Sequence, residues 1–201
     1  MSRNFAIRAL ALRLVRQKDG VTAVEFALAA PVLLILLLGI YDIGHMAYSS
    51  AVLHGAVEEV ARRAALETAS VADEDAYVRG VIQGVAPGAT VTTTRESYYD
   101  FTDVDRPESW NDANSSGACD NSESYTDENR NGRWDADVGQ SGNGGANDVV
   151  IYKVTVAYTP LFPVPFMTNH NQQREISATT VKKNQPFATQ TTYGSSAGTC
   201  G

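Results

Sequence analysis

The sequence predicts an α+β fold in which a long N-terminal helix packs on a small antiparallel sheet. Three observations support this fold class: a long apolar run near the N-terminus, an amphipathic helical pattern that continues it, and later segments rich in β-branched residues. Between those segments lies a polar stretch, 102–147, in which 26 of the 46 residues are Asp, Asn, Ser or Gly. Such a composition cannot bury an apolar core of its own, so we predict a long polar loop that is either functional or disordered.

The first element is an apolar helix. Residues 26–40 are all apolar, Gly or Pro, and together with 21–25 they form a segment of 20 residues. At about 1.5 Å per residue this segment is long enough to cross a hydrocarbon core. The alternative is a secretory signal peptide, but no small-residue cleavage site follows Ile40 and the helical pattern continues beyond it. We predict a transmembrane segment at 21–40, bent at Pro31, that continues as one helix to about residue 68.

The charge on either side of this segment is uneven. Residues 1–20 carry a net charge of +4, which leaves −11 on the remainder. Because Lys and Arg are retained on the cytoplasmic side of a membrane, residues 1–20 are predicted to be a cytoplasmic leader. The acidic remainder argues against nucleic acid as a partner.

The helix beyond the membrane is amphipathic. Its apolar residues recur mostly at steps of three or four: Ile43, Met46, Ala47, Ala51, Val57, Ala61 and Ala64. We expect this stripe to pack partly on the sheet and partly on other subunits.

The remaining elements form a domain at 69–187. A short helix is predicted within 71–88, and β-branched or alternating patterns predict strands within 89–101, 147–162 and 173–184. The proline-rich stretch 159–167, which bridges two strands, is predicted to lie on the surface. Its apolar residues, Leu161 and Phe162 among them, are placed in the core, with a contact surface as the alternative. Residues 188–201 are predicted to be a flexible tail.

Glu25 is the only charged residue in the apolar segment. A lone carboxylate in lipid costs about 3 kcal/mol, so a cationic partner is expected. The alternative is that the side chain of Glu25 reaches the headgroup layer.

The residues around Glu25 carry a family resemblance. Gly20, four residues, then Glu25 and Phe26 at the start of a long apolar helix resemble the prepilin-peptidase site of type IV pilin-like proteins. The stretch "DGVTAVEFALAAPVLL" and the later "ISATTVKKNQPF" resemble the TadE-like family of tight-adherence (Flp, type IVb) pilus assembly proteins. The likeness is strongest over 19–39, weaker over 147–187 and slight between them.

The resemblance implies processing and assembly. A prepilin peptidase would cut between Gly20 and Val21, and Glu25, with Phe26, would belong to the assembly face, where the glutamate meets the new amino terminus of a neighbouring subunit. The chain would be a pseudopilin or minor pilin of the bacterial inner membrane, with a periplasmic C-terminal domain. Its partners would be other pilins and pseudopilins, inner-membrane pilus assembly proteins, the peptidase and membrane lipid. The alternative function is an uncleaved, membrane-tethered periplasmic binding module.

The polar loop contains a calcium-type spacing in "DENRNGRWDADV". Its candidate ligands are Asp127, Asn129, Asn131 and Asp135, at the first, third, fifth and ninth positions, with Gly132 at the sixth. Val138 stands where a bidentate glutamate is expected, so Asp137 beside it, or Asp120 from outside, would have to substitute. An Asx-rich turn without metal is the alternative.

Two further features bear on function. Cys119 and Cys200 are the only cysteines, and in an oxidising periplasm we favour one internal disulfide over free thiols or a bond to another subunit. Catalysis finds no support, because His45 and His54 are about half a turn out of phase on the helix and His170 has no obvious nucleophile near it in the sequence. The run "GQSGNGG" is neither a nucleophile elbow nor a phosphate loop. We therefore predict that the protein is not an enzyme.

Overall fold

The computed structural model of the protein describes residues 20–64, 70–162, 173–185 and 194–201. Of the predicted leader, only Gly20 lies within these ranges. The end predicted for the first helix, near residue 68, falls among the residues that are not described.

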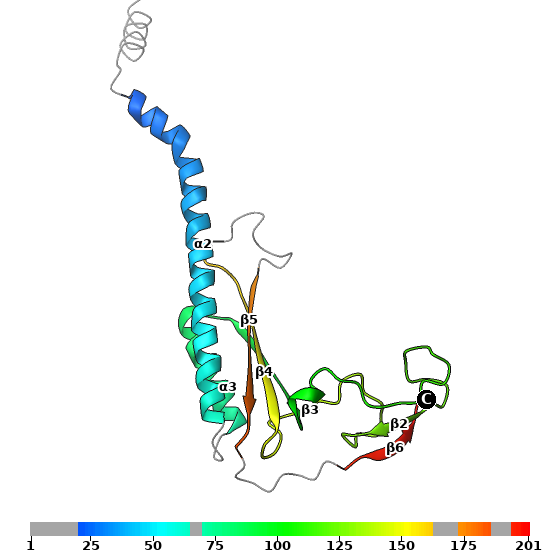
Figure 1. Ribbon diagram of the computed structural model, residues 1–201. Helices are drawn as coiled ribbons and strands as arrows, with labels where there is room; N and C mark the ends of the chain where they lie inside the picture. Colours follow the sequence, from blue (N-terminus) through cyan, green and yellow to red (C-terminus); the bar gives the residue numbers. More distant parts are fainter. Residues whose placement is uncertain (1–19, 65–69, 163–172, 186–193) are drawn as a thin grey trace, which may run out of the picture.

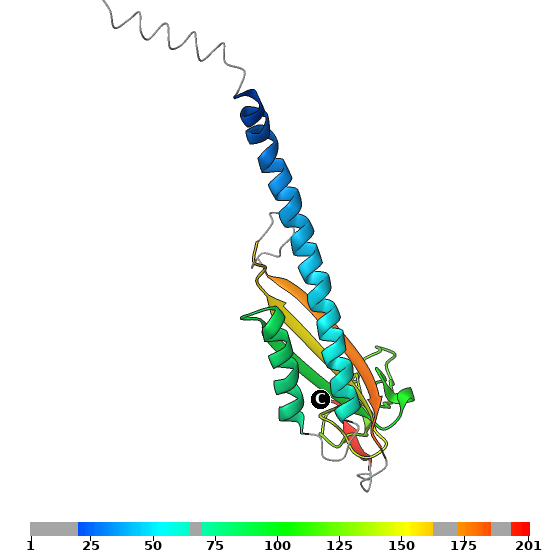
Figure 2. The ribbon, with the colours of Figure 1, turned by 90° about the vertical axis from the view of Figure 1, so that its left-hand side faces the viewer.

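Helix α2 (Val21–Ala64) is the long helix that the sequence predicts. It runs through Pro31 without interruption and is about 66 Å long at the usual rise. Figures 1 and 2 show that its first half projects away from the rest of the molecule, whereas its second half lies against the sheet. This is the one helix among the described residues that is long and apolar enough to cross a membrane, and its most apolar stretch is not covered by any other part of the chain.

Helix α3 (Val71–Val85) corresponds to the predicted short helix. Ser70 caps its N-terminus, where the Ser70 hydroxyl accepts a hydrogen bond from the backbone N–H of Asp73. Asp73 and Glu74 in the first turn also interact favourably with the helix dipole. The chain turns after the helix at Gly88, whose φ of 78° favours glycine.

The main sheet has four antiparallel strands in the order β3-β1-β4-β5. Their bounds are β1 (Thr90–Tyr98), β3 (Gln140–Ser141), β4 (Val149–Tyr158) and β5 (Arg174–Lys183). The three long strands are those that the sequence predicts, and β3 is a two-residue addition at one edge. Helices α2 and α3 lie side by side on one face of this sheet (Figure 2).

A second, two-stranded sheet lies beyond the end of the first. Strand β2 (Ser124–Asp127) pairs antiparallel with β6 (Ser196–Thr199), and a short helix, η1 (Phe101–Asp103), leads into the polar segment. The sequence predicts a polar loop at 102–147 and a flexible tail at 188–201. A part of each instead forms a strand of this sheet, 124–127 in the loop and 196–199 in the tail, because backbone pairing needs no apolar side chains. Residues 188–193 of the predicted tail lie outside the described residues.

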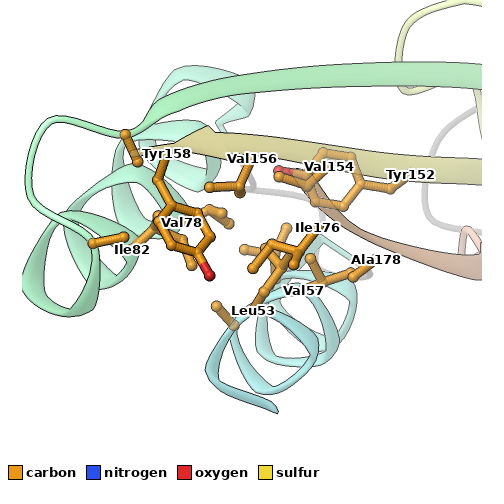
Figure 3. Close-up of a cluster of buried hydrophobic side chains, with 14 residues drawn as sticks. Leu53, Val57, Val78, Ile82, Tyr152, Val154, Val156, Tyr158, Ile176 and Ala178 are labelled. Carbon is orange, nitrogen blue, oxygen red and sulfur yellow. The ribbon is translucent and has the colours of Figure 1, made fainter. Parts of the chain in front are cut away.

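The hydrophobic core lies between the two helices and the main sheet. Figure 3 shows side chains of α2, α3, β4 and β5 pointing toward one another there. Its members include Leu53, Val57, Val78, Ile82, Val154, Val156, Tyr158, Ile176 and Ala178. Burial of each large aliphatic side chain contributes about 1.5–3 kcal/mol to stability.

The buried face of α2 differs from the predicted stripe. Val57 of the predicted stripe is buried and Met46 packs partly against the core, but Ile43 of the stripe is half exposed. Leu53, Ala56 and Val60, which the stripe did not include, are buried as well. The prediction differs from the structure because the buried face also includes two polar residues, Asp42 and Ser49. An apolar pattern alone does not reveal a face that contains polar positions with partners across the interface.

The proline-rich stretch also departs from its prediction. Leu161 is 66% exposed and Phe162 is 48% exposed, so neither side chain belongs to the core. The contact surface that the sequence left as the alternative fits these two residues better.

Candidate functional site

The predicted processing and assembly residues all lie at the exposed end of α2. Val21 is the first residue of the helix, and its first backbone hydrogen bond runs from the N–H of Val24 to the carbonyl of Gly20, at 3.1 Å. Among the described residues, nothing lies within 4 Å of the position that a Cβ atom on Gly20 would occupy, and Gly20 itself is exposed. Val21 and Phe26 are also exposed.

Glu25 lies one helical turn after Val21, on nearly the same face. Its side chain is exposed, and no Lys, Arg or His among the described residues lies within ion-pair distance. The helix therefore presents one uncompensated carboxylate within an uncovered apolar surface.

A polar seam joins α2 to the sheet just past its apolar half. Arg174 at the start of β5 forms an ion pair with Asp42, which is 3% exposed. One turn later, the His45 imidazole contacts the carbonyl oxygen of Val85 at 3.0 Å. The first contact attaches β5 to α2 at this level, and the second attaches the end of α3 to it.

A second polar cluster lies under α3. The guanidinium of Arg95 bonds both Glu74 (3.1 Å) and Asp75 (2.8 Å), and it stacks over the ring of Tyr152 at 4.2 Å. Burial acts to raise the pKa of Asp75, but the hydrogen bond and charge of Arg95 outweigh it and hold that pKa below its ordinary value. All four groups face partners within the fold, which is the arrangement of a structural cluster.

The polar segment contains a tandem repeat that the sequence-level reasoning missed. Residues 108–122 read "ESWNDANSSGACDNS" and residues 123–137 read "ESYTDENRNGRWDAD". Both copies share Glu-Ser-aromatic, then Asp-x-Asn-x-(Ser or Asn)-Gly-x-x-Asp. A search for a 15-residue period would have found it, and would have shown that the calcium-type spacing occurs twice.

The two copies fold alike. In the first, Asp112 accepts hydrogen bonds from the backbone N–H groups of Ser116 (2.9 Å) and Gly117 (3.0 Å). In the second, Asp127 accepts from those of Asn131 (3.2 Å) and Gly132 (2.9 Å), which are the equivalent positions.

The backbone conformations of the two loops agree as well. Gly117 and Gly132 have φ values of 76° and 80°, and the equivalent residues Ser115 and Arg130 have φ values of 59° and 61°. Both glycines occupy the left-handed conformation that a glycine adopts most easily.

Each copy supplies a buried glutamate to the loop of the other. The carboxylate of Glu108, in the first copy, accepts from the backbone N–H groups of Glu128 (2.7 Å), Asn129 (3.4 Å) and Asp135 (3.1 Å) in the second copy.

The carboxylate of Glu123, in the second copy, accepts from Ala113 (2.8 Å), Asn114 (3.3 Å) and Asp120 (3.3 Å) in the first. The six donors occupy equivalent positions, so the exchange is reciprocal.

The copies also pair through their aromatic residues. Trp110 and Tyr125, which are equivalent, form an antiparallel bridge. The flanking bonds run from the N–H of Thr126 to the carbonyl of Ser109 (2.8 Å) and from the N–H of Asn111 to the carbonyl of Ser124 (2.9 Å). Pairing of like with like in this way is what two halves related by a two-fold axis produce.

The tandem repeat holds its carboxylates with few cations. Glu108 is fully buried and Glu123 is 6% exposed, yet among the described residues neither has a Lys or Arg within ion-pair distance. In that part of the chain, no three carboxylate, imidazole or thiolate side chains converge on one point, so a bound cation would also need amide, hydroxyl or carbonyl oxygens of the loops. The loops are held by hydrogen bonds that backbone N–H groups donate to carboxylates. An ionised carboxylate has about four lone-pair sites, so these bonds leave some of them free.

The predicted calcium ligands are not all brought together. Asp127, Asn129, Asn131 and Asp135 line one loop, and the amide groups of both asparagines donate to Asp135 at 2.8 and 2.5 Å. Asp137 is turned away, because it accepts from the hydroxyl of Tyr98 at 2.8 Å.

That interaction leaves Asp137 no part in the loop. Burial of Tyr98 and its bond to Asp137 raise the pKa of Tyr98, so the tyrosine stays a donor. The carboxylate that takes the place of the missing twelfth-position glutamate is Glu108.

A disulfide ties this region to the C-terminus. Cys119 in the first loop is bonded to Cys200, directly after β6, and their Cα atoms are 5.6 Å apart. Together with the pairing of β2 and β6, it closes the tandem repeat against the end of the chain.

Comparison with known proteins gives one family match, which lies over the N-terminal helix. The model of a family described as TadE-like protein matches residues 20–62, which confirms the family resemblance of the sequence. The match covers Gly20 and nearly all of α2, and it ends before α3. No curated protein and no solved structure gives a significant match. Over this stretch the chain is similar to TadE-like proteins.

Proposed function

We propose that this protein is a pseudopilin or minor pilin of a tight-adherence pilus system, cut after Gly20 and assembled through α2 in the inner membrane. The observation that carries the proposal is the uncovered apolar half of α2, with Glu25 one turn inside an accessible Gly20–Val21 bond. The sheet and α3 pack only on the second half of the helix, which leaves the first half for lipid or for other subunits.

Cleavage and assembly are linked by charge. Cutting the bond between Gly20 and Val21 creates an ammonium group at the end of α2. A carboxylate in lipid is costly when it is alone and much less so when it is paired, so Glu25 favours an arrangement that brings an ammonium group to it. If the ammonium belongs to a neighbouring copy or a related pilin, the pairing fixes the relative height of the two helices.

The direct test is replacement of Glu25 in cells that make the pilus. Glu25→Gln keeps the size of the side chain but removes its charge, and we expect it to abolish filament assembly while the protein still reaches the membrane. Glu25→Asp is the matched control, since it keeps the carboxylate and should retain partial assembly. Normal filaments from Glu25→Gln would overturn the proposal.

An uncleaved membrane tether is the alternative, and it is decided at Gly20. Gly20→Trp should block processing, because a large side chain cannot fit where the peptidase approaches the backbone closely. If Gly20→Trp protein is full-length and still functional, the chain is a tether and not an assembly subunit.

A second proposed activity is calcium binding by the tandem repeat. The calcium-type spacing occurs twice, and in the first copy it is complete: Asp112, Asn114 and Ser116 are followed by Gly117, Asp120 and Glu123, with the glutamate at the twelfth position. Buried carboxylates are normally paired with cations or bound to metals, and Glu108 and Glu123 have no cationic partner among the described residues. We propose that Ca²⁺ binds both loops and stabilises the tandem repeat.

Fluorescence of Trp134, inside the second loop, reports on this proposal. Ca²⁺ titration of the full chain in detergent should change the emission with a dissociation constant of about 10⁻⁴ to 10⁻³ M, the range of extracellular calcium modules. Asp127→Asn should weaken the response, whereas Asp137→Asn should not, because Asp137 bonds Tyr98. No change up to millimolar Ca²⁺ would exclude a useful site.

A further inference from the structure

An exposed apolar surface lies where the apolar half of α2 ends. It consists of Tyr41, Leu161 and Phe162, which are 46%, 66% and 48% exposed. Tyr41 directly follows Ile40, the last residue of the apolar run, and Leu161 and Phe162 follow β4. We call these three residues the juxtamembrane patch.

The patch is continuous with the membrane-spanning surface. The ring of Phe162 meets that of Tyr41 edge to face, with the centroids 5.7 Å apart. Figure 1 shows the β4–β5 end of the sheet beside the middle of α2, at the level where the helix leaves its apolar half. Residues from two distant parts of the chain thus form one surface at that level.

The nearest acid on the helix does not oppose contact with lipid. Asp42 follows Tyr41, but it is buried and its charge is paired with Arg174. The seam that neutralises Asp42 also attaches β5 to the helix at this level. The same contacts therefore position the patch and remove the charge beside it.

From this geometry we propose that the juxtamembrane patch inserts into the interface of the lipid bilayer. Aromatic side chains concentrate at membrane–water interfaces, where their rings meet both the acyl chains and the headgroups. With α2 as one attachment and the patch as a second, the extramembrane part would rest on the membrane surface at a fixed height and tilt. The inference depends on the proposed insertion of α2 into a membrane, but not on pilus assembly.

Quenching by brominated lipids tests the insertion. The full chain would be placed in phosphatidylcholine and phosphatidylglycerol vesicles whose acyl chains carry bromine, with a single tryptophan added at position 162 (Phe162→Trp). Phe101→Trp is the matched control, since Phe101 is exposed to a similar extent but lies in η1, at the far end of β1. The parent protein gives the background from Trp110 and Trp134.

We expect the Phe162→Trp signal to lose intensity in brominated vesicles and to shift to shorter wavelength, whereas the Phe101→Trp signal should change no more than the background. Leu34→Trp, in the middle of the apolar run, reports separately on α2. If Leu34→Trp is quenched and Phe162→Trp is not, the inference is wrong while membrane insertion stands. Loss of quenching at both positions would refute the insertion of α2 itself.

A protein partner is the competing occupant of the patch. If Phe162→Trp is shielded from aqueous iodide but is not quenched by brominated lipid, a protein covers the patch and the proposal is overturned. Circular dichroism of each variant would establish that the three substitutions leave the fold unchanged.

Discussion

The helix–sheet core and the tandem repeat are stabilised by opposite means. The core, between α2, α3 and the main sheet, is built from aliphatic and aromatic side chains such as Leu53, Ile82 and Val156. In the tandem repeat, buried carboxylates accept from backbone N–H groups, and the chain is closed by a disulfide. A segment that is too polar for a core can still fold if its backbone donors are satisfied by its own acids.

The largest effect should come from the core. Leu53→Ala removes a fully buried side chain of α2, and we expect it to lower the free energy of unfolding by about 2–5 kcal/mol. Hydrogen exchange followed by mass spectrometry should show faster exchange in α3 and β4, with little change in the tandem repeat. Equal acceleration in both regions would show that they unfold together and would remove the distinction between them.

Reduction of the disulfide should destabilise the tandem repeat and not the helix–sheet core. Breaking the bond between Cys119 and Cys200 frees a segment closed over a separation of 81 residues, and a loss of about 2–4 kcal/mol is typical. The change should be confined to β2, β6 and the tandem repeat, as measured by hydrogen exchange with and without reductant. A Cys119→Ser/Cys200→Ser double variant that still protects β6 would contradict the role we give this bond.

Removal of Glu108, which the first copy supplies to the second loop, tests the hydrogen bonds that hold that loop. Glu108→Ala leaves three backbone N–H groups of the second loop without their acceptor, at a cost of about 1–3 kcal/mol for each group that stays buried and unsatisfied. Proteolysis should then cut within 123–137. Glu175→Ala, on the exposed side of β5, is the control and should leave the digestion pattern unchanged.

The smallest expected effect is a loss of stability of the tandem repeat at low pH. Hydrogen bonds from Arg106 hold the pKa of Glu128 below its ordinary value of 4.5. A carboxylate whose pKa is lower in the folded state than in the unfolded state stabilises the folded state at pH values above its ordinary pKa. This stabilisation is lost as the pH falls through the pKa of the folded state.

The tandem repeat should therefore loosen below about pH 4.5, and an Arg106→Gln variant should lack this dependence. The measurement is hydrogen exchange of residues 123–137 between pH 6 and pH 3.5, corrected for intrinsic rates. An unchanged profile in the variant would show that other acids cause the loosening.

Much of the fold could be predicted because its patterns are local. The apolar run of α2 and the alternation in β4 each lie within one element, and each predicted the element that the structure shows. The buried face of α2 could not be read in the same way, because Asp42 and Ser49 lie on it and their neighbours come from distant strands.

The candidate sites were predicted less completely, for two different reasons. Gly20 and Glu25 belong to a linear motif, so their placement at the exposed end of α2 follows from the sequence alone. In the polar segment, the second loop has Val138 and not a glutamate at its own twelfth position. The glutamate that serves this loop, Glu108, comes from the preceding copy of the repeat, and such an exchange is visible only once the 15-residue period or the structure is known.

We propose above that the chain is cut after Gly20 and then assembled through the uncovered apolar half of α2. The most direct test of this proposal is the intact mass, with N-terminal sequence, of the protein taken from membranes and sheared filaments of cells that express the prepilin peptidase. We predict a chain that begins at Val21, and its disappearance in cells without the peptidase. A protein that retains residues 1–20 in assembled filaments would contradict the account.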